Sequence, residues 1–500
     1  MSKRLILVLA LAFVVGVAFA AYAEVQNVKV SGDLTVKGVA RNNLDLAKKG
    51  MSNVGSTASI FDDRESDLLS ITRLRVDADL TDNVSATVRL LNERNWNGES
   101  TTGVENNRNI GFTALNNAPT ESQIDLDLAY VTVKEFLYSP LSLKVGRQEL
   151  RFGNGWIVGD PDTNGVALKS SLAEGDLSAR KSFDSVRVTL DYNPLVIDGI
   201  YAKIAENTTT VNDDTTLYGV NAAYELNKTT TLEGFFFSKV RGSQAAAVTN
   251  IDGGSFTSAK QAPDKVNTLG ARVVNTSVKN LAVDAQAAYQ FGTYNPRLDP
   301  NARFISATNK AETADRRAWG AEVVATYDLK DIAMLSKYSP SISAAYVYLS
   351  GESRDRVGNG AYHGWDGMFE DQTFGHLINA IMGFSNTHIV GANLKAKATD
   401  DVSVSLDYVQ AYLAKRFADG RKTILSGVPT ARQFTMGDDR FLGQEIDLTL
   451  AYDYTEDVQF SLLGGVFLPS RNINREANQG TTTGKRAAAT ELIGSMKVTF

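Results

Sequence analysis

The sequence predicts an all-β fold, a membrane-spanning antiparallel up-and-down β-barrel of about 18 strands. Three observations predict it. Apolar and polar residues alternate in long segments throughout the chain, and the connections between these segments are short and long in turn. A third observation is that residues 1–23 have the pattern of a secretory signal and that no later run of 18 apolar residues follows them.

The predicted signal peptide opens with a basic pair, Lys3 and Arg4, and continues with the apolar residues 5–20. Residues 21–23 fit the cleavage pattern of small residues, so one barrel domain is expected over 24–500. The chain has no cysteine, which excludes a disulfide framework. Its formal net charge of −6 argues against nucleic acid as a partner, because nucleic acid binds basic surfaces.

The predicted strands share a two-residue alternation, which places successive side chains on opposite faces. In the first strand, Val28 and Val30 alternate with Lys29 and Ser31. Most of the segments are 10–15 residues long, which suits a tilted strand that crosses a bilayer. In chain order the predicted strands are 27–41, 67–80, 84–95, 121–134, 140–152, 183–193, 195–206, 216–226, 230–241, 265–276, 280–294, 316–328, 339–352, 387–399, 402–415, 442–454, 457–468 and 488–500.

The connections predict the topology. Short turns follow the even-numbered strands, as at 81–83, 227–229, 399–401 and 455–457, whereas nearly all odd-numbered strands are followed by long segments. This rhythm is typical of barrels in the outer membrane of Gram-negative-type bacteria, with short periplasmic turns and long extracellular loops. The alternative, a soluble β-propeller, needs an internal repeat of about 40–50 residues, and we find none.

The chain ends on an aromatic residue, Phe500. Because lipid tolerates no unpaired sheet edge, the last strand is expected to pair with the first. A C-terminal aromatic on the final strand resembles the signal that outer-membrane barrels present to their assembly machinery. We therefore expect this machinery and outer-membrane lipid as partners. Tyrosines near strand ends, Tyr130 among them, are expected to face lipid as an interfacial girdle.

A barrel of this size encloses a water-filled channel, so the polar row of each strand is the expected functional surface. Charges on this wall would set up a field that acts on passing solutes. The alternative is that they form ion pairs between neighbouring strands of a wet wall. The basic and acidic candidates nearly balance: Lys37, Arg73, Arg75, Arg89, Lys144, Arg187, Lys203, Arg272, Lys395, Lys397 and Lys497 against Asp77, Asp79, Asp125, Asp127, Asp191, Glu225, Asp284, Glu322, Asp328, Asp407, Glu445, Asp447 and Asp453.

Arg147 poses a question of orientation. Strict alternation from Lys144 places Arg147 towards lipid, where a charge is costly. Either Arg147 lies at the rim of the barrel, or a bulge near Gly146 turns it inward. The candidates for lining the pore and contacting solute are Arg73, Arg75, Arg89, Asp125, Asp127, Lys144, Arg147, Gln148, Asp184, Arg187, Glu445 and Asp447.

Two loop motifs suggest further features. Asp160, Asp162 and Asn164 are spaced like the start of a calcium loop, but the twelfth position is Ser171 and Pro161 intrudes. Residues 374–384 have helical spacing of apolar side chains. This helix would either lie over the pore mouth as a lid or simply pack a long loop. No cofactor is predicted.

Three pieces of sequence together resemble the alginate-export family of outer-membrane porins. They are the strand with Asp125, Asp127 and Tyr130, the triplet 146–148, and the segment 183–187. The resemblance implies a monomeric 18-stranded porin that passes an anionic polysaccharide or its fragments. It also implies functional roles at the matching positions Arg147, Asp184 and Arg187.

The function predicted from these observations is a porin that passes hydrophilic solutes by diffusion, including anionic oligo- or polysaccharides. The alternatives are a general non-selective porin and a structural sleeve for a partner such as a multihaem cytochrome. An enzyme is not predicted. The three histidines, His363, His376 and His388, lie in or beside one loop, and no G-x-S-x-G motif accompanies them.

Overall fold

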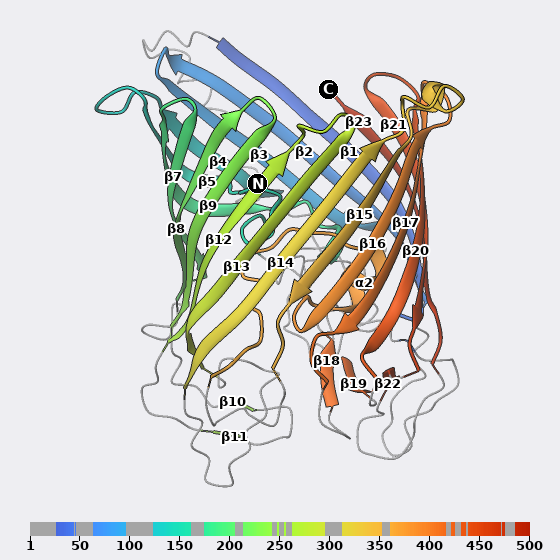
Figure 1. Cartoon of the computed structure of the whole chain (residues 1–500). Helices are drawn as coiled ribbons and strands as arrows, with labels where there is room; N and C mark the ends of the chain where they lie inside the picture. Colours follow the sequence, from blue (N-terminus) through green and yellow to red (C-terminus); the bar gives the residue numbers. More distant parts are fainter. Residues whose placement is uncertain are drawn as a thin grey trace, which may run out of the picture.

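A computed structural model confirms the predicted architecture, a closed barrel of 18 antiparallel strands (Figure 1). The predicted signal peptide lies outside the described part of the chain. The structure describes residues 27–44, 46, 64–96, 124–161, 175–205, 214–242, 248–249, 255–256, 263–295, 313–352, 361–416, 422–425, 432–436, 439–471, 473–475 and 486–500.

The predicted strand boundaries agree with the barrel strands to within three residues at every end. The boundaries agree because apolar and polar residues alternate along a strand for as long as one of its faces is apolar. The barrel strands are β1 (Asn27–Asn42), β2 (Arg64–Thr81), β3 (Val84–Asn95), β4 (Ile124–Val133), β5 (Leu141–Glu149), β6 (Ser182–Asp191), β7 (Leu195–Ala205), β8 (Thr215–Asn227), β9 (Thr230–Arg241), β12 (Asp264–Asn275), β13 (Leu281–Tyr294), β14 (Ala314–Asp328), β15 (Ser341–Leu349), β16 (Thr387–Lys397), β17 (Val402–Leu413), β20 (Phe441–Asp453), β21 (Val458–Pro469) and β23 (Ala489–Thr499).

Each barrel strand pairs with its neighbours in chain order, and the last strand pairs with the first. At this closure Asp33 of β1 lies opposite Thr499 of β23. The backbone N–H of Gly32 donates to the carbonyl of Phe500 at 2.8 Å, and the N–H of Phe500 donates back at 3.0 Å. The predicted closure is therefore present, and it leaves no open edge among the barrel strands.

Apart from the helix expected within 374–384, the sequence did not predict the short elements, which lie mostly in the long loops. β10 pairs with β11, and β18, β19 and β22 form a small sheet at the long-loop end of the barrel (Figure 1). No described helix is long and apolar enough to cross a membrane. The bounds of these elements are β10 (Val248–Thr249), β11 (Ser255–Phe256), β18 (Lys422–Leu425), β19 (Arg432–Met436), β22 (Ile473–Arg475), the 3-10 helices η2 (Gly175–Leu177) and η4 (Ser336–Tyr338), and the helix α2 (His376–Ile381).

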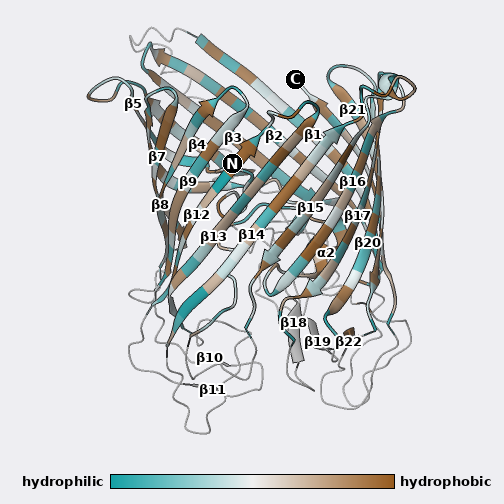
Figure 2. Ribbon diagram, in the orientation of Figure 1, coloured by the Kyte–Doolittle hydropathy of each residue, from teal (hydrophilic) through white to brown (hydrophobic). Residues whose placement is uncertain are grey.

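The outer face of the barrel carries the apolar row of each strand. Leu74, Val220 and Leu406 are 40–47 % exposed to the surroundings of the barrel. Figure 2 shows the resulting stripes, with apolar and polar residues alternating along the strands. Such a surface is stable only where lipid covers it, because exposed apolar area of this extent is unfavourable in water.

The expected outward orientation of Tyr130 is wrong. The pairing of β3 with β4 shifts by one residue at Asp127, where Arg89 lies opposite Leu128 while Leu90 lies opposite Leu126. A one-residue bulge moves the following side chains to the other face. Tyr130 therefore faces the lumen, where the Lys144 ammonium lies 4.7 Å from its ring centroid.

Candidate functional site

Two connections fold into the barrel and narrow its lumen. The first inward segment comprises residues 150–161 and 175–181 between β5 and β6, and the second comprises residues 361–386 between β15 and β16. Backbone hydrogen bonds join them, with the Phe369 N–H donating to the Ile157 carbonyl at 3.0 Å and the Gly159 N–H to the Phe369 carbonyl at 2.7 Å. The two connections therefore form one unit inside the barrel.

Apolar side chains pack this unit against the inner wall. Trp156 and Trp365 stack with their ring centroids 5.2 Å apart, one from each inward segment. Phe152 lies 5.3 Å from Phe237 of β9. The wall residues of this cluster are Phe183, Ile200, Ala202, Leu217, Phe235, Phe237, Val266, Ala288, Ala318, Val347, Leu349, Ile389 and Val409, which come from β6–β9 and β12–β17. The lumen is thus filled on this side near the long-loop end.

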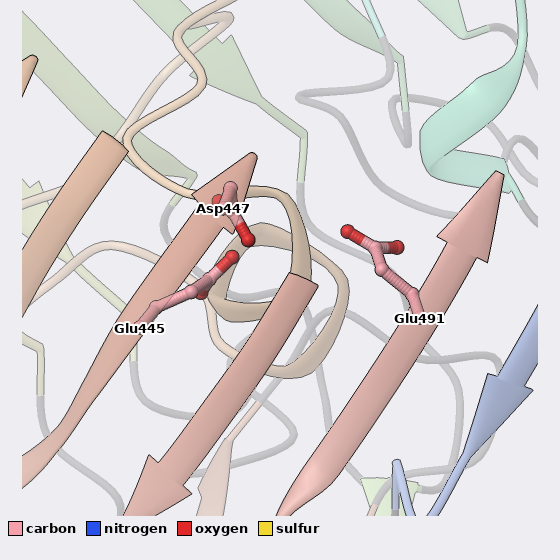
Figure 3. A group of neighbouring side chains, drawn as sticks. All are labelled: Glu445, Asp447 and Glu491. Atoms are coloured by element: carbon pink, nitrogen blue, oxygen red, sulfur yellow. The ribbon is translucent and has the colours of Figure 1, made fainter. Parts of the chain in front are cut away.

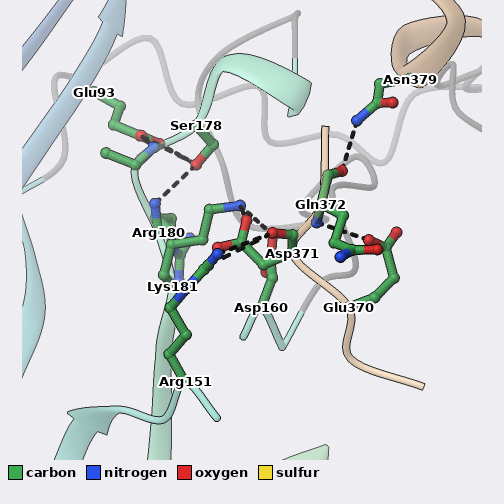
Figure 4. A network of polar contacts seen from close by, with 11 residues as sticks. Glu93, Arg151, Asp160, Ser178, Arg180, Lys181, Glu370, Asp371, Gln372 and Asn379 are labelled. Atoms are coloured by element: carbon green, nitrogen blue, oxygen red, sulfur yellow. Dashed lines mark hydrogen bonds and ion pairs between the residues drawn. The ribbon is translucent and has the colours of Figure 1, made fainter. Parts of the chain in front are cut away.

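A polar network ties the two inward segments together (Figure 4). Arg151 and Lys181 of the first segment both reach Asp371 of the second, the lysine at 3.2 Å, and Lys181 also binds Asp160. Burial and the charges of the two aspartates act in opposite directions on Lys181. Burial lowers its pKa, but the aspartates outweigh it and hold the pKa above its usual value.

Glu370 is the exception in this network, because no cation pairs with it among the described contacts. Its carboxylate accepts the backbone N–H of Gln372 at 2.8 Å. Burial raises the pKa of Glu370 to about 7, and the nearby charges of Asp160 and Asp371 act in the same direction. The second inward segment therefore carries a carboxyl group that titrates near neutral pH.

Further contacts fix the second inward segment to the wall. Glu322 of β14 accepts hydrogen bonds from Gln372 at 2.8 Å and from Asn154 of the first segment at 2.7 Å. Asp366 pairs with Lys239 of β9. Burial acts to raise the pKa of Asp366, but the charges of Lys239 and Arg316 outweigh it and hold the pKa at about 2.

The helix expected within 374–384 is present as α2, and it packs against the wall. Leu377, Ile378 and Ile381 are at most 1 % exposed and lie in a cluster with wall residues such as Leu442 and Phe467. The N–H groups of Leu377 and Ile378 both donate to Glu445 of β20, each at 2.7 Å. Of the two alternatives drawn from the sequence, loop packing describes this helix.

A cavity of about 440 Å³ remains beside the inward segments. Its wall comes from the inner rows of β1, β2, β21 and β23, and residues of both inward segments cover it. Lys37, Arg73 and Lys497 contribute positive charge, and Asp33 and Asp176 negative charge. The other lining residues are Thr35, Ile71, Leu177, Ser178, Ala179, Thr373, His376, Asn379, Gln459 and Ser495.

Most arginines that the sequence singled out are neutralised within the wall. Arg73 binds Asp33 of the neighbouring strand at 2.9 Å, and Arg75 binds Asp77 at 2.7 Å. Arg187 binds Asp198 at 2.7 Å and Arg272 binds Asp284 at the same distance. Arg89 holds Asp127 at 2.6 Å and also contacts Glu149. Except for Arg75–Asp77 within β2 and Arg89–Glu149 between β3 and β5, these pairs join neighbouring strands. The wall charges therefore form ion pairs rather than an open field of arginines.

Lys37 and Lys497 differ from those arginines. Neither lysine forms an ion pair within the described part of the chain, although both line the cavity. They come from neighbouring strands, with Lys37 opposite Ser495 and Lys497 opposite Thr35. The two ammonium groups are thus the positive charges of the cavity wall that have no assigned carboxylate.

Arg147 and Asp184 lie on the outer face, which corrects their assignment to the pore. Arg147 lies opposite Asp184 in an unbroken register, and their side chains are 3.1 Å apart. Val145, on the same face, is 45 % exposed, and Asp184 lies opposite Lys203, which shares that face. Gly146 has a φ of 126°, yet the pairing does not shift there, so Arg147 lies at the rim near the long loops.

The remaining candidates occupy the inner wall. Gln148 is buried and donates to the carbonyl of Ser185 at 3.1 Å. Asp125 lies 3.6 Å from Arg180 of the first inward segment. Of the possible calcium loop, Asp160 binds Lys181, whereas Asp162 and Asn164 lie outside the described residues. The described part of that loop thus uses its carboxylate in an ion pair.

The sequence reasoning missed the inward segments as a packed unit. One signal for it was available, because residues 235–237 are three consecutive phenylalanines and place apolar side chains on both faces of β9. A strand that is apolar on both faces has protein on one side and lipid on the other. Nothing comparable marks Arg151 and Asp371, which meet across 220 residues of sequence.

Comparison with known proteins agrees with this geometry. A family model described as Alginate export matches residues 53–484. Solved structures from Pseudomonas aeruginosa with the same fold include OccK8 (OprE), with a TM-score of 0.51 and 11 % identity over 94 % of this chain and 98 % of that one. OpdQ has a TM-score of 0.51 with 9 % identity over 96 % and 99 % of the two chains.

A third similar structure is the outer membrane protein opdK, with a TM-score of 0.50 and 10 % identity over 95 % of this chain and 100 % of that one. At these identities the likeness concerns the fold alone. A search of curated proteins found no match.

Proposed function

This chain belongs to the alginate export family, and from that premise we propose that it is a channel for short anionic saccharides. The barrel fold and the family point to an outer-membrane transport channel of a Gram-negative bacterium rather than to an enzyme. Its apolar outer row contacts the lipid. The nature of the solute is the step that we add.

The observation that carries the proposal is that Lys37 and Lys497, which line the lumen cavity, form no ion pair with any described residue. Alginate is a polymer of uronic acids, and each sugar carries a carboxylate that an ammonium group attracts. Hydroxyl and amide groups of Ser495, Gln459 and Asn379 lie in the same cavity and suit the hydroxyl groups of a sugar. The cavity volume is in the range that small-molecule sites occupy.

The sleeve for a cytochrome is less favoured by the same geometry. The inward segments fill part of the lumen with their own side chains, among them Trp156, Trp365 and Phe369. The cavity of about 440 Å³ suits a small solute and not a folded haem protein. A general porin remains the second candidate, since wall ion pairs would leave the lumen without strong preference for either ion sign.

The test is planar-bilayer conductance of the refolded protein, with the reversal potential in a salt gradient and with uronate oligomers added. We expect a preference for anions and block by the oligomers. The double variant Lys37→Gln/Lys497→Gln should lose both. Lys203→Gln, on the outer face, is the matched control and should behave as the wild type. Equal reversal potentials and equal block in the wild type and the double variant would refute the proposal.

The family resemblance and the barrel lead to one expectation about oligomeric state and one about assembly. We expect the chain to act as a monomer, as the resemblance to the alginate-export porins implies, and the 18 strands close without a strand from a second chain. We also expect the last strand to be presented to the assembly machinery, since Phe500 ends it and is 64 % exposed. Deletion of Phe500 should lower the amount of assembled protein in outer-membrane fractions, and cross-linking in membranes should give no dimer.

A further inference from the structure

Three carboxylates meet on the inner wall beside α2. Glu445 and Asp447 come from β20 and Glu491 from β23, and oxygens of all three lie within 4.8 Å of one another (Figure 3). Their residues are only 1 %, 1 % and 5 % exposed. Carboxylates this deeply buried are costly unless another charge neutralises them.

The available positive charge is small. Arg41 of β1 donates through Nε to Glu491 Oε2 at 3.2 Å. Its two terminal nitrogens are bound to Asp176 at 2.9 and 2.7 Å. One guanidinium group thus serves two carboxylates, and Glu445 and Asp447 form no ion pair among the described contacts. The His376 imidazole lies near Asp447 and Glu491 and carries a positive charge only when it is protonated.

The hydrogen bonds leave two oxygens without partners. Both oxygens of Glu445 accept N–H groups from the first residues of α2, and Asp447 Oδ2 accepts the N–H of His376 at 3.4 Å. Within the part of the chain that the structure describes, Asp447 Oδ1 and Glu491 Oε1 have no hydrogen-bond partner, although both are buried. In native proteins such atoms are rare, and an ion is one of the usual reasons for them.

Gly465 of β21 keeps the space between these two oxygens open. It lies opposite Asp447 on one side and Glu491 on the other. A Cβ atom at Gly465 would lie 2.5 Å from Asp447 Oδ1 and 3.1 Å from Glu491 Oε1. Any larger residue would therefore fill the place towards which both unpartnered oxygens point.

We propose that this chain binds one hard divalent cation, Ca²⁺ or Mg²⁺, between Asp447 and Glu491, with Glu445 beside them. Carboxylate oxygens are the ligands that these cations prefer, and the described cluster offers neither thiolate nor imidazole ligands for a softer metal. The neighbouring cavity, lined by His376 and Ser495, allows water to complete the coordination shell.

The position of the site gives the cation a structural role. Glu445 already anchors α2 through two backbone hydrogen bonds. A cation that neutralises Asp447 and Glu491 next to it would hold β20, β23 and the second inward segment together. Removal of the cation is then expected to loosen this segment from the wall. The alternative is that the carboxylates share protons and bind no metal.

The experiment measures bound metal on the full chain, refolded in detergent free of lipopolysaccharide and stripped with a chelator. Equilibrium dialysis is then run with Ca²⁺ alone and with Mg²⁺ alone, and bound metal is quantified by elemental analysis. Asp447→Asn/Glu491→Gln removes the two charges. Gly465→Ala blocks the site without changing a charge. Gly464→Ala is the matched control, because its Cβ would meet only Leu492 at 3.9 Å.

We expect the wild type and Gly464→Ala to bind one cation more per chain than Gly465→Ala and the double variant. The cation that gives this difference at the lower concentration identifies the ion. In thermal unfolding, the added cation should raise the Tm of the wild type and of Gly464→Ala, but not the Tm of Gly465→Ala or of the double variant.

Equal binding by the wild type and Gly465→Ala would overturn the proposal. The proposal would also be overturned if the wild type retained no cation and reached its full stability on acidification alone. That result is expected if the carboxylates share protons. Heat-modifiable mobility on gels shows which variants have folded. If the double variant does not fold, the comparison of Gly465→Ala with Gly464→Ala, which changes no charge, still tests the proposal.

Discussion

The two halves of the inner wall of this barrel differ in composition. Near the long loops, the inner rows of many strands are apolar, as at Phe183 of β6 and Phe237 of β9. Nearer the short turns, the same rows carry charge, with Arg187 on β6 and Glu233 on β9. The loop half packs against the two inward segments, whereas the turn half forms ion pairs.

The difference shows how the narrowing of the pore is built into the strands. Apolar side chains on a wet wall would be unfavourable, so an apolar inner row requires protein to cover it. The inward segments supply that cover through Trp156, Trp365 and Phe369. A lumen-facing row that changes from charged to apolar along its strands therefore predicts where a loop enters the barrel.

The largest expected effect comes from breaking the apolar half. Trp365→Ala removes the stack with Trp156 and leaves a cavity in the packed unit, which should cost about 3–5 kcal/mol of stability. The second inward segment should also loosen, so single-channel conductance should rise. Urea unfolding and bilayer recordings measure the two effects. Trp319→Ala on the outer face is the control, and an unchanged conductance in Trp365→Ala would contradict this account of the narrowing.

The next effect depends on pH and concerns Glu370. Its pKa is about 7 in the folded protein and lies near 4.5 when it is unfolded, so the folded state binds the proton more tightly. Stability from this group is therefore complete below about pH 4.5 and is lost as the pH rises to about 7. Glu370→Gln should not show this loss and should exceed the wild type above pH 7 by at most about 3 kcal/mol.

Unfolding free energies of both proteins from pH 4 to pH 8 test this prediction. The difference between the two curves isolates Glu370 from the titration of Asp160, Asp371 and Lys181 around it. Parallel curves would show that Glu370 is not held in a protonated state by its surroundings.

Substitutions in the charged half of the inner wall, near the short turns, should lower stability less than Trp365→Ala does. Asp127→Asn leaves Arg89 with Glu149 as its remaining carboxylate and should cost about 2 kcal/mol, because the arginine is buried. Asp77→Asn is the comparison, since the side chains of Arg75 and Asp77 are 37 % and 33 % exposed, and it should cost less than about 1 kcal/mol. Chemical unfolding measures the loss of stability in each variant. A larger loss in Asp77→Asn than in Asp127→Asn would contradict this prediction.

The smallest effect is expected outside the lumen. Arg147→Ala removes a pair at the rim in which Asp184 is 62 % exposed at its side chain, so the change in stability should stay below about 1 kcal/mol. Its conductance and reversal potential should equal those of the wild type. A shift in the reversal potential would return Arg147 to the pore and contradict its outward orientation.

The sequence by itself determined the strands, their ends and the closure at Phe500. The two-residue period is a local property of an extended chain, and lipid on the outer face enforces it along every strand. It failed at Tyr130, because a single extra residue at Asp127 reverses the faces and leaves no mark in the pattern of apolar residues.

Only the tertiary structure decided how the lumen is filled and which charges remain unpaired. Arg151 meets Asp371 across 220 residues, and Arg41 meets Glu491 across 450. Such partners are set by the closure of the barrel and by the path of the loops inside it, and no local pattern encodes them. Ion pairs, unpaired lysines and buried carboxylates depend on distances between strands, which exist only once the chain has closed.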